Sequence, residues 1–177
     1  SDELVKRVTI SEGITSIGDY AFSSCSSLKS ITIPNSVTVI GDGTFCNCSS
    51  LTSITIPNSV ATIRESAFSK CSFLTSITIP TSVKLIEAEA FEECTQLTSG
   101  KLGDISWKFN EDKTELLFTG TGRMPEFLEG GAPWSSCYRI RAVKINEGIT
   151  SIGDFAFSNC EELEKVFLPS TIESIGF

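Results

Sequence analysis

Apolar residues recur along this chain in a long, regular phrase. When the chain is written in rows that begin at Val8, Ile31, Ile54 and Ile77, successive rows start 23 residues apart. Each position of a row then holds the same kind of side chain as the same position of the next row. The apolar columns are Ile10, Ile33, Ile56, Ile79; Ile14, Val37, Val60, Val83; Ile17, Ile40, Ile63, Ile86; Phe22, Phe45, Phe68, Phe91; Cys25, Cys48, Cys71, Cys94; and Leu28, Leu51, Leu74, Leu97. Self-similarity at a fixed period predicts a repeat protein.

The register is interrupted once and then returns. It restarts at Val143, and the returning columns hold Ile145, Ile149, Ile152, Phe157, Cys160, Leu163 and then Val166, Leu168, Ile172 and Ile175. We therefore divide the chain into four N-terminal coils (1–99), an insertion (100–142) and one full and one partial C-terminal coil (143–177). The last row stops in mid-pattern, so we expect the sequence to be a piece of a longer protein.

Each coil is expected to contribute one strand to a parallel sheet. The segment 30–33 alternates polar and apolar side chains, as a half-buried strand does, and Pro34 ends it because proline has no N–H for the ladder. Stacked coils place every column beside an identical neighbour about 4.8 Å away. The tract 18–22 and its copies fit short helical turns or second strands on the outer side. The pattern predicts a solenoid with a parallel strand per coil.

The insertion has a pattern of its own. Ile105, Trp107 and Phe109 alternate with polar residues, a turn-like segment follows at 110–113, and Leu116 and Phe118 alternate again. This pattern predicts a β-hairpin, followed by a loop over residues 120–134. Two interpretations stay open. The insertion is either a spacer whose aromatic residues pack on the adjoining coils, or a binding loop in which Trp107 and Trp134 contact a partner.

The recurring phrase resembles that of a known family. One coil carries it as Ile33-Pro34, Val37, Ile40-Gly41, Phe45, Cys48, Leu51 and Ile54, and a later coil as Ile145, Ile149, Ile152-Gly153, Ala156-Phe157, Cys160 and Leu163. Over residues 8–99 and 143–177 the chain resembles BspA-like (Treponema pallidum-type) leucine-rich repeat surface proteins, with departures at Thr44, Arg64 and Glu87. The insertion resembles a spacer found inside such proteins.

This resemblance implies a leucine-rich-repeat solenoid and an extracellular or cell-surface location, in a bacterium or a parasitic protist. Such proteins are often implicated in adhesion to host matrix, host cells or other microbes, and their repeats share no catalytic residues. The resemblance therefore implies a binding module that engages a protein or glycan on a host or microbial surface. A purely structural stalk or spacer of a larger surface protein is the alternative.

The composition of the chain excludes several classes of partner and of catalytic site. The net charge is 14 − 22 = −8, so nucleic acids and anionic membranes are unfavourable partners. No stretch approaches the roughly 20 apolar residues that a membrane span needs, so no membrane insertion is expected within this fragment. Histidine is absent, which removes the common acyl-transfer triads and the commonest metal ligand. The glutamate clusters at 87–93 and 161–164 are expected on solvated turns. We expect no enzyme activity and no cofactor or metal.

The cysteines follow the repeat. Five of the seven, at positions 25, 48, 71, 94 and 160, occupy one column. Neighbouring Cα atoms in a stack fall within disulfide range, but side chains in register point the same way. We therefore favour a ladder of buried free thiols over disulfides. A zinc site is disfavoured because the sulfur atoms would form a line rather than a tetrahedron.

The outward positions of the strands form the candidate binding surface. Threonine and serine repeat there in the N-terminal coils, and lysine and phenylalanine replace them after the insertion. Threonine also favours strands for purely structural reasons. The candidate contact residues are Thr9, Ser30, Thr32, Ser53, Thr55, Ser76, Thr78, Lys144, Lys165 and Phe167.

Overall fold

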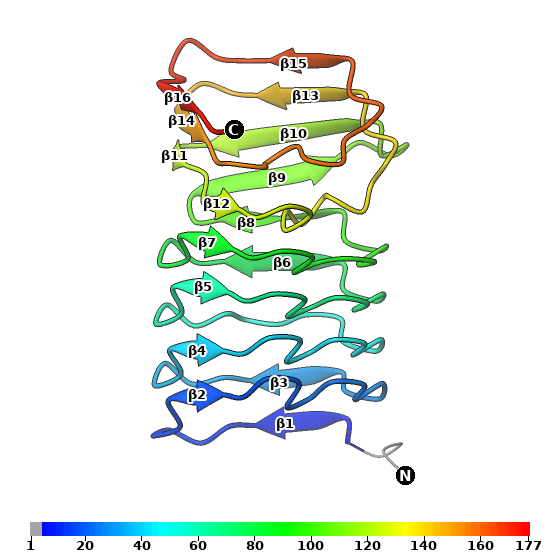
Figure 1. Ribbon diagram of the computed structural model, residues 1–177, viewed down its shortest axis with the longest axis vertical. Helices are drawn as coiled ribbons and strands as arrows, with labels where there is room; N and C mark the ends of the chain where they lie inside the picture. Colours follow the sequence, from blue (N-terminus) through cyan, green and yellow to red (C-terminus); the bar gives the residue numbers. More distant parts are fainter. Residues whose placement is uncertain (1–4) are drawn as a thin grey trace.

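The computed structural model, which describes residues 5–177, is a stack of coils along one axis (Figure 1). One side of the stack carries the longer strands, which we call the strand face. In the N-terminal half it consists of β1 (Arg7–Thr9), β3 (Ser30–Thr32) and β6 (Ser76–Ile79). The coil between β3 and β6 contributes Thr55, which forms an isolated parallel bridge to Thr78 of β6. β1 and β3 pair in parallel with a 23-residue register. The solenoid of stacked coils predicted from the repeat is confirmed.

A second series of short strands lines the opposite side. It comprises β2 (Ser16–Ile17), β4 (Val39–Ile40), β5 (Thr62–Ile63), β7 (Leu85–Ile86), β11 (Gly122–Arg123), β12 (Glu126–Phe127), β14 (Ile149–Ile152) and β16 (Ser174–Ile175). They pair in parallel as β2-β4, β5-β7-β12 and β11-β14-β16. Of the two expectations for the outer side, the structure therefore has second strands. Residues 5–177 contain no helix.

The tract that begins at Gly18 forms a wall of turns instead of a helical turn. Its backbone N–H groups donate alternately to carbonyl groups of the next coil and to carbonyl groups of the same turn. The Phe22 N–H donates to the Thr44 carbonyl of the next coil at 2.9 Å, and the Ser23 N–H closes a turn onto Tyr20 at 2.9 Å. Tyr20 and Ser24 have φ angles of 55° and 61°. A left-handed residue in every turn stops a helix from propagating, since a helix needs consecutive right-handed residues.

The predicted apolar columns form the core between the two series of strands. The phenylalanine rings of successive coils stack, with ring centroids 5.4 Å apart from Phe45 to Phe68 and again from Phe68 to Phe91. Side chains of the first and last coils are more exposed, because only one neighbouring coil covers them. Val166 and Leu168 of the last coil, for example, are 42% and 46% exposed.

The insertion continues the strand face, although it breaks the 23-residue register of the coils. The predicted hairpin is confirmed as β9 (Ile105–Phe109) and β10 (Glu115–Gly120), which pair antiparallel. β8 (Ser99–Leu102) pairs with β6 in parallel and with β9 antiparallel, and β10 pairs in parallel with β13 (Ala142–Ile145). Together with β15 (Lys165–Phe167) they form a six-stranded sheet in the order β15-β13-β10-β9-β8-β6 (Figure 1).

The two tryptophans of the insertion lie in the core. Trp107 and Trp134 are each 1% exposed, and their rings pack edge to face with centroids 5.4 Å apart. Trp134 also contacts Phe118 and Phe127, and its indole N–H donates to the Ala156 carbonyl at 2.7 Å. Of the two interpretations left open, this burial agrees with the spacer, in which the aromatic residues pack on adjoining coils, and it does not agree with a loop in which Trp107 and Trp134 contact a partner.

Candidate functional site

The strand face presents the predicted contact residues to solvent. Alternation along each strand turns the isoleucine column inward and the serine and threonine columns outward. Thr9 lies beside Thr32, and Ser76 and Thr78 of β6 flank the buried Ile77. The exposed members are Thr9, Thr32, Ser53, Thr55, Ser76, Thr78, Lys165 and Phe167, whereas Ser30 and Lys144 are half-buried.

Lysine replaces these hydroxyl residues toward the C-terminal end of the strand face. Lys101 of β8 lies beside Thr78, Lys108 of β9 beside Ser99, and Lys144 of β13 beside Phe167. Lys165 of β15 follows at the edge of the sheet. We call Lys101, Lys108, Lys144 and Lys165 the lysine row.

Lys101 and Lys108 were not among the contact residues predicted from the sequence. Two signals were present. The 23-residue spacing from Thr78 points to Lys101, and alternation with Trp107 and Phe109 places Lys108 outward. The lysine row thus crosses the predicted boundary at residue 100.

The lysine row gives this part of the strand face a charge opposite to that of the whole chain. The strands β6, β8, β9, β10, β13 and β15 contain four lysines and one acidic residue, Glu115, so their sum is 4 − 1 = +3. The chain as a whole carries −8. Glu115 is paired, since its carboxylate lies 2.8 Å from the Lys144 ammonium nitrogen.

A hollow lies within the lysine row. It has a volume of about 490 Å³ and is bordered by Ser76, Thr78, Ser99, Lys101, Lys108 and Leu117. Gly100 and Trp107 also line it. Hydroxyl groups and ammonium groups therefore surround a shallow depression on an otherwise flat sheet.

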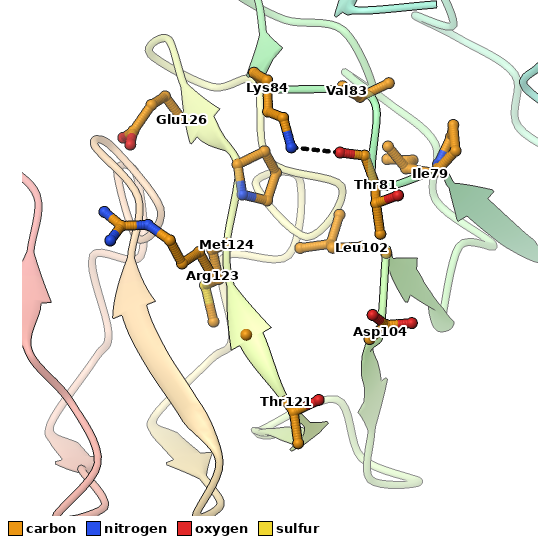
Figure 2. A pocket seen from close by; sticks show the side chains of 14 residues that line it. Ile79, Thr81, Val83, Lys84, Leu102, Asp104, Thr121, Arg123, Met124 and Glu126 are labelled. Atoms are coloured by element: carbon orange, nitrogen blue, oxygen red, sulfur yellow. Dashed lines mark hydrogen bonds between the residues drawn. The ribbon is translucent and has the colours of Figure 1, made fainter. Parts of the chain in front are cut away.

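A second depression lies away from the strand face, where the insertion meets the fourth coil. Figure 2 shows this cleft of about 520 Å³. Buried apolar residues such as Leu102 and Met124 contribute to its lining, together with exposed charges of both signs at Lys84, Asp104 and Arg123. The Lys84 ammonium donates to the Thr81 carbonyl at 2.5 Å. With cations and carboxylates mixed around it, the cleft has no single charge preference.

The cysteine column is part of the structural wall. Sγ of Cys71 donates to the Phe45 carbonyl at 3.2 Å, and Cys48 and Cys94 make the same bond to the coil before each of them. Burial raises the pKa of the Cys48 thiol to about 12 and also raises the pKa of Cys71. A thiol held protonated is a poor nucleophile and a poor metal ligand.

Two further features of the described chain bear on function. Within residues 5–177 no three side chains of the cysteine, aspartate and glutamate type are grouped so that they could hold a metal ion. The same residues include no helix with the length and apolarity to cross a bilayer.

Comparison with solved structures gives similar solenoids. A leucine-rich repeat protein of Treponema pallidum superposes with a TM-score of 0.64 and 25% identity, over 97% of this chain and 73% of that one. The pneumococcal vaccine antigen PcpA superposes with a TM-score of 0.50 and 26% identity, over 97% of this chain and 50% of that one. This chain thus spans half of the PcpA chain. No curated protein sequence matches it significantly.

The sequence profile of the BspA-type leucine-rich repeat region matches six copies, over residues 1–112 and 132–177. The matched ranges include all the regular coils and the first strands of the insertion, and they cover well over half of the chain. This chain belongs to the BspA-type leucine-rich repeat family.

Proposed function

We propose that this chain is the binding module of an extracellular or cell-surface protein, and that it engages a protein or glycan of a host or another microbe through the strand face. The observation that carries the proposal is the continuity of that face. It runs from β1 and β3, through the coil that holds Thr55, into the six-stranded sheet that ends at β15, and most of the predicted contact residues on it are exposed. An extended, regular surface suits an extended partner.

Membership of a leucine-rich repeat family supports binding as the general role, and the description of PcpA as a vaccine antigen supports exposure to a host. The alternative is a stalk that only holds another domain away from the cell. Phe167 supports the binding module, because its pairing with Lys144 places an aromatic side chain on the outward side of the sheet, and aromatic side chains are common anchors in interfaces.

The test is a binding screen of the protein against purified matrix proteins and cell-surface glycans. Thr32→Glu, Thr55→Glu and Phe167→Ala are compared with Thr95→Glu, which places the same new charge on an exposed turn. We expect each strand-face variant to lower the affinity for a detected partner about tenfold, a change of about 1.4 kcal/mol in the free energy of binding. If a partner binds all four variants like the parent protein, the strand face is only a scaffold and the stalk interpretation holds.

A further inference from the structure

We infer that the lysine row binds a linear, sulfated or otherwise polyanionic polysaccharide. This inference rests on the proposed function and names the class of partner for the C-terminal half of the strand face. Lys108 and Lys144 lie on one line across the sheet, perpendicular to the strands, with Leu117 between them. Lys101 lies two residues to one side of this line and Lys165 two residues to the other side. Strands lie about 4.8 Å apart, so the row extends across about 19 Å.

The lysine row can attract a polyanion because few acidic residues share its sheet. Among the acidic residues that the structure describes, only Glu115 lies in the six strands of this sheet, and it is already paired with Lys144. At physiological ionic strength a charge is screened beyond about 8 Å. A polyanion held on the row therefore interacts mainly with the lysines, despite the overall charge of −8.

The surroundings of the row favour a polysaccharide over an acidic protein. Ser76, Ser99, Ser106 and Thr119 place hydroxyl groups between and beside the lysines. Protein interfaces draw their energy from aromatic or arginine anchors that fill pockets, whereas the hollow here is shallow and bordered largely by hydroxyl and ammonium groups. Such a surface can donate hydrogen bonds to sugar hydroxyls, carboxylates and sulfates along a chain.

Phe167 and Leu117 complete the surface. Leu117 lies between Lys108 and Lys144 on the middle strand, and Phe167 lies beside Lys144 on the last one. Their exposed apolar surface can pack against the C–H face of a sugar ring, as Phe167 is 52% exposed. Alternating cationic and apolar contacts along one line fit a polymer whose rings and anionic groups alternate.

The experiment measures binding of heparin, dextran of similar length and poly-glutamate to the protein as a function of NaCl concentration. We expect heparin to bind and its affinity to fall steadily with salt, because ammonium groups displace the counterions of a polyanion. Dextran tests for a contribution from hydroxyl groups alone, and poly-glutamate tests for charge alone. The expected order is heparin first, poly-glutamate weaker, and dextran without detectable binding.

The decisive variant combines Lys101→Thr with Lys108→Ser. Each substitution copies the residue that pairs with that lysine on the neighbouring strand, Thr78 of β6 and Ser99 of β8. The matched control is Lys70→Ser with Lys84→Ser, which removes the same charge from exposed positions outside the strand face. Both should unfold at the temperature of the parent protein. We expect the first pair to bind heparin about tenfold more weakly with a shallower salt dependence, and the control pair to bind like the parent.

Three results would overturn the inference: no heparin binding at low salt, an equal loss in the control pair, or poly-glutamate binding as tightly as heparin. An equal loss in the control pair would move the site to the cleft beside Lys84 or reduce it to net charge. Failure here leaves the proposed function intact if another partner is sensitive to Thr32→Glu or Thr55→Glu, which lie in coils without a lysine of the row. Failure of both sets of variants would remove the strand face as a binding surface.

Discussion

Gly100 of β8 lies directly opposite Trp107 of β9, and the indole fills the space that a side chain at position 100 would take. A Cβ atom on Gly100 would lie 2.9 Å from Nε1 of Trp107 and 2.5 Å from the Ile77 carbonyl oxygen. Position 100 continues the column of Ile54 and Ile77, which point into the core. One large side chain from the reversed strand thus replaces one aliphatic side chain of the repeat.

This exchange predicts that Gly100→Val is destabilising, although Val is close to the residue that the repeat itself would place there. Overpacking of a core costs about 1–3 kcal/mol, and we expect a loss of that size in the free energy of unfolding measured with denaturant. Trp107→Phe combined with Gly100→Val should recover part of the loss, but not all of it, because the Ile77 carbonyl stays in place. Unfolding curves of Gly100→Val that superpose on those of the parent would contradict this account.

The phenylalanine stack predicts a large effect of Phe68→Ala. Phe68 is fully buried between Phe45 and Phe91. Truncation of such a side chain costs about 3–5 kcal/mol, from lost burial and from the cavity left behind. Phe73→Ala is the control, since Phe73 is 62% exposed and should change the stability by no more than about 0.5 kcal/mol. Similar losses in the two variants would mean that the stack is not the core.

The buried thiols predict that stability falls in alkaline solution. In the unfolded chain a thiol loses its proton near its usual pKa of about 8.5, whereas burial raises the pKa of Cys48 and Cys94 to about 12. Between these values the folded protein holds protons that the unfolded chain releases, so the free energy of unfolding decreases as the pH rises. Below the lower value this contribution to stability is complete.

Cys71→Ala isolates this effect from the titration of other groups. The variant should be less stable at neutral pH but should lose stability less steeply above pH ~8.5 than the parent protein does, by at most about 1.4 kcal/mol per pH unit. Thiol reagents should label Cys71 in the folded parent far more slowly than in the unfolded chain. Equal pH slopes, or rapid labelling of folded protein, would argue against a protonated, buried thiol.

The left-handed residues of the turn wall predict opposite effects for two substitutions at Ser66. Its φ angle is 52°, a conformation that costs a side-chain-bearing residue about 1–2 kcal/mol and costs a β-branched residue most. Ser66→Gly should leave the stability unchanged or raise it slightly, whereas Ser66→Val should lower it by about 1–2 kcal/mol in thermal or denaturant unfolding. A stable Val variant would show that the turn accommodates other backbone angles.

The regular coils could be predicted from sequence because every coil carries the same pattern of apolar residues. Ile33, Ile56 and Ile79 identify an inward column, and Pro34 marks the end of the strand before it. The hairpin from Ile105 to Phe118 was also predictable, since a period of two is a local signal. The candidate contact residues of the N-terminal coils follow directly from that same alternation, and their solvent-facing placement agrees with the structure.

The turn wall and the joining of the insertion could not be predicted in the same way. The first left-handed position holds Tyr20, Gly43, Ser66 and Glu89 in successive coils, so glycine marks the conformation in only one of these four coils. That conformation is selected by hydrogen bonds between coils, which a single coil does not contain. The burial of Trp134 likewise depends on residues as distant as Ala156, and pattern rules that act within a short window cannot detect such contacts.

The hydrogen bonds between coils also determine how the protein responds to mechanical load. On the strand face, and again in the turn wall, the coils are joined by hydrogen bonds that run along the long axis of the stack. A pulling force between the two ends lies parallel to these bonds, so it peels coils apart one after another and does not shear many bonds at once. The reversed strand β9 is paired on both sides and backed by Trp107, so peeling from either end must cross a tightly packed joint.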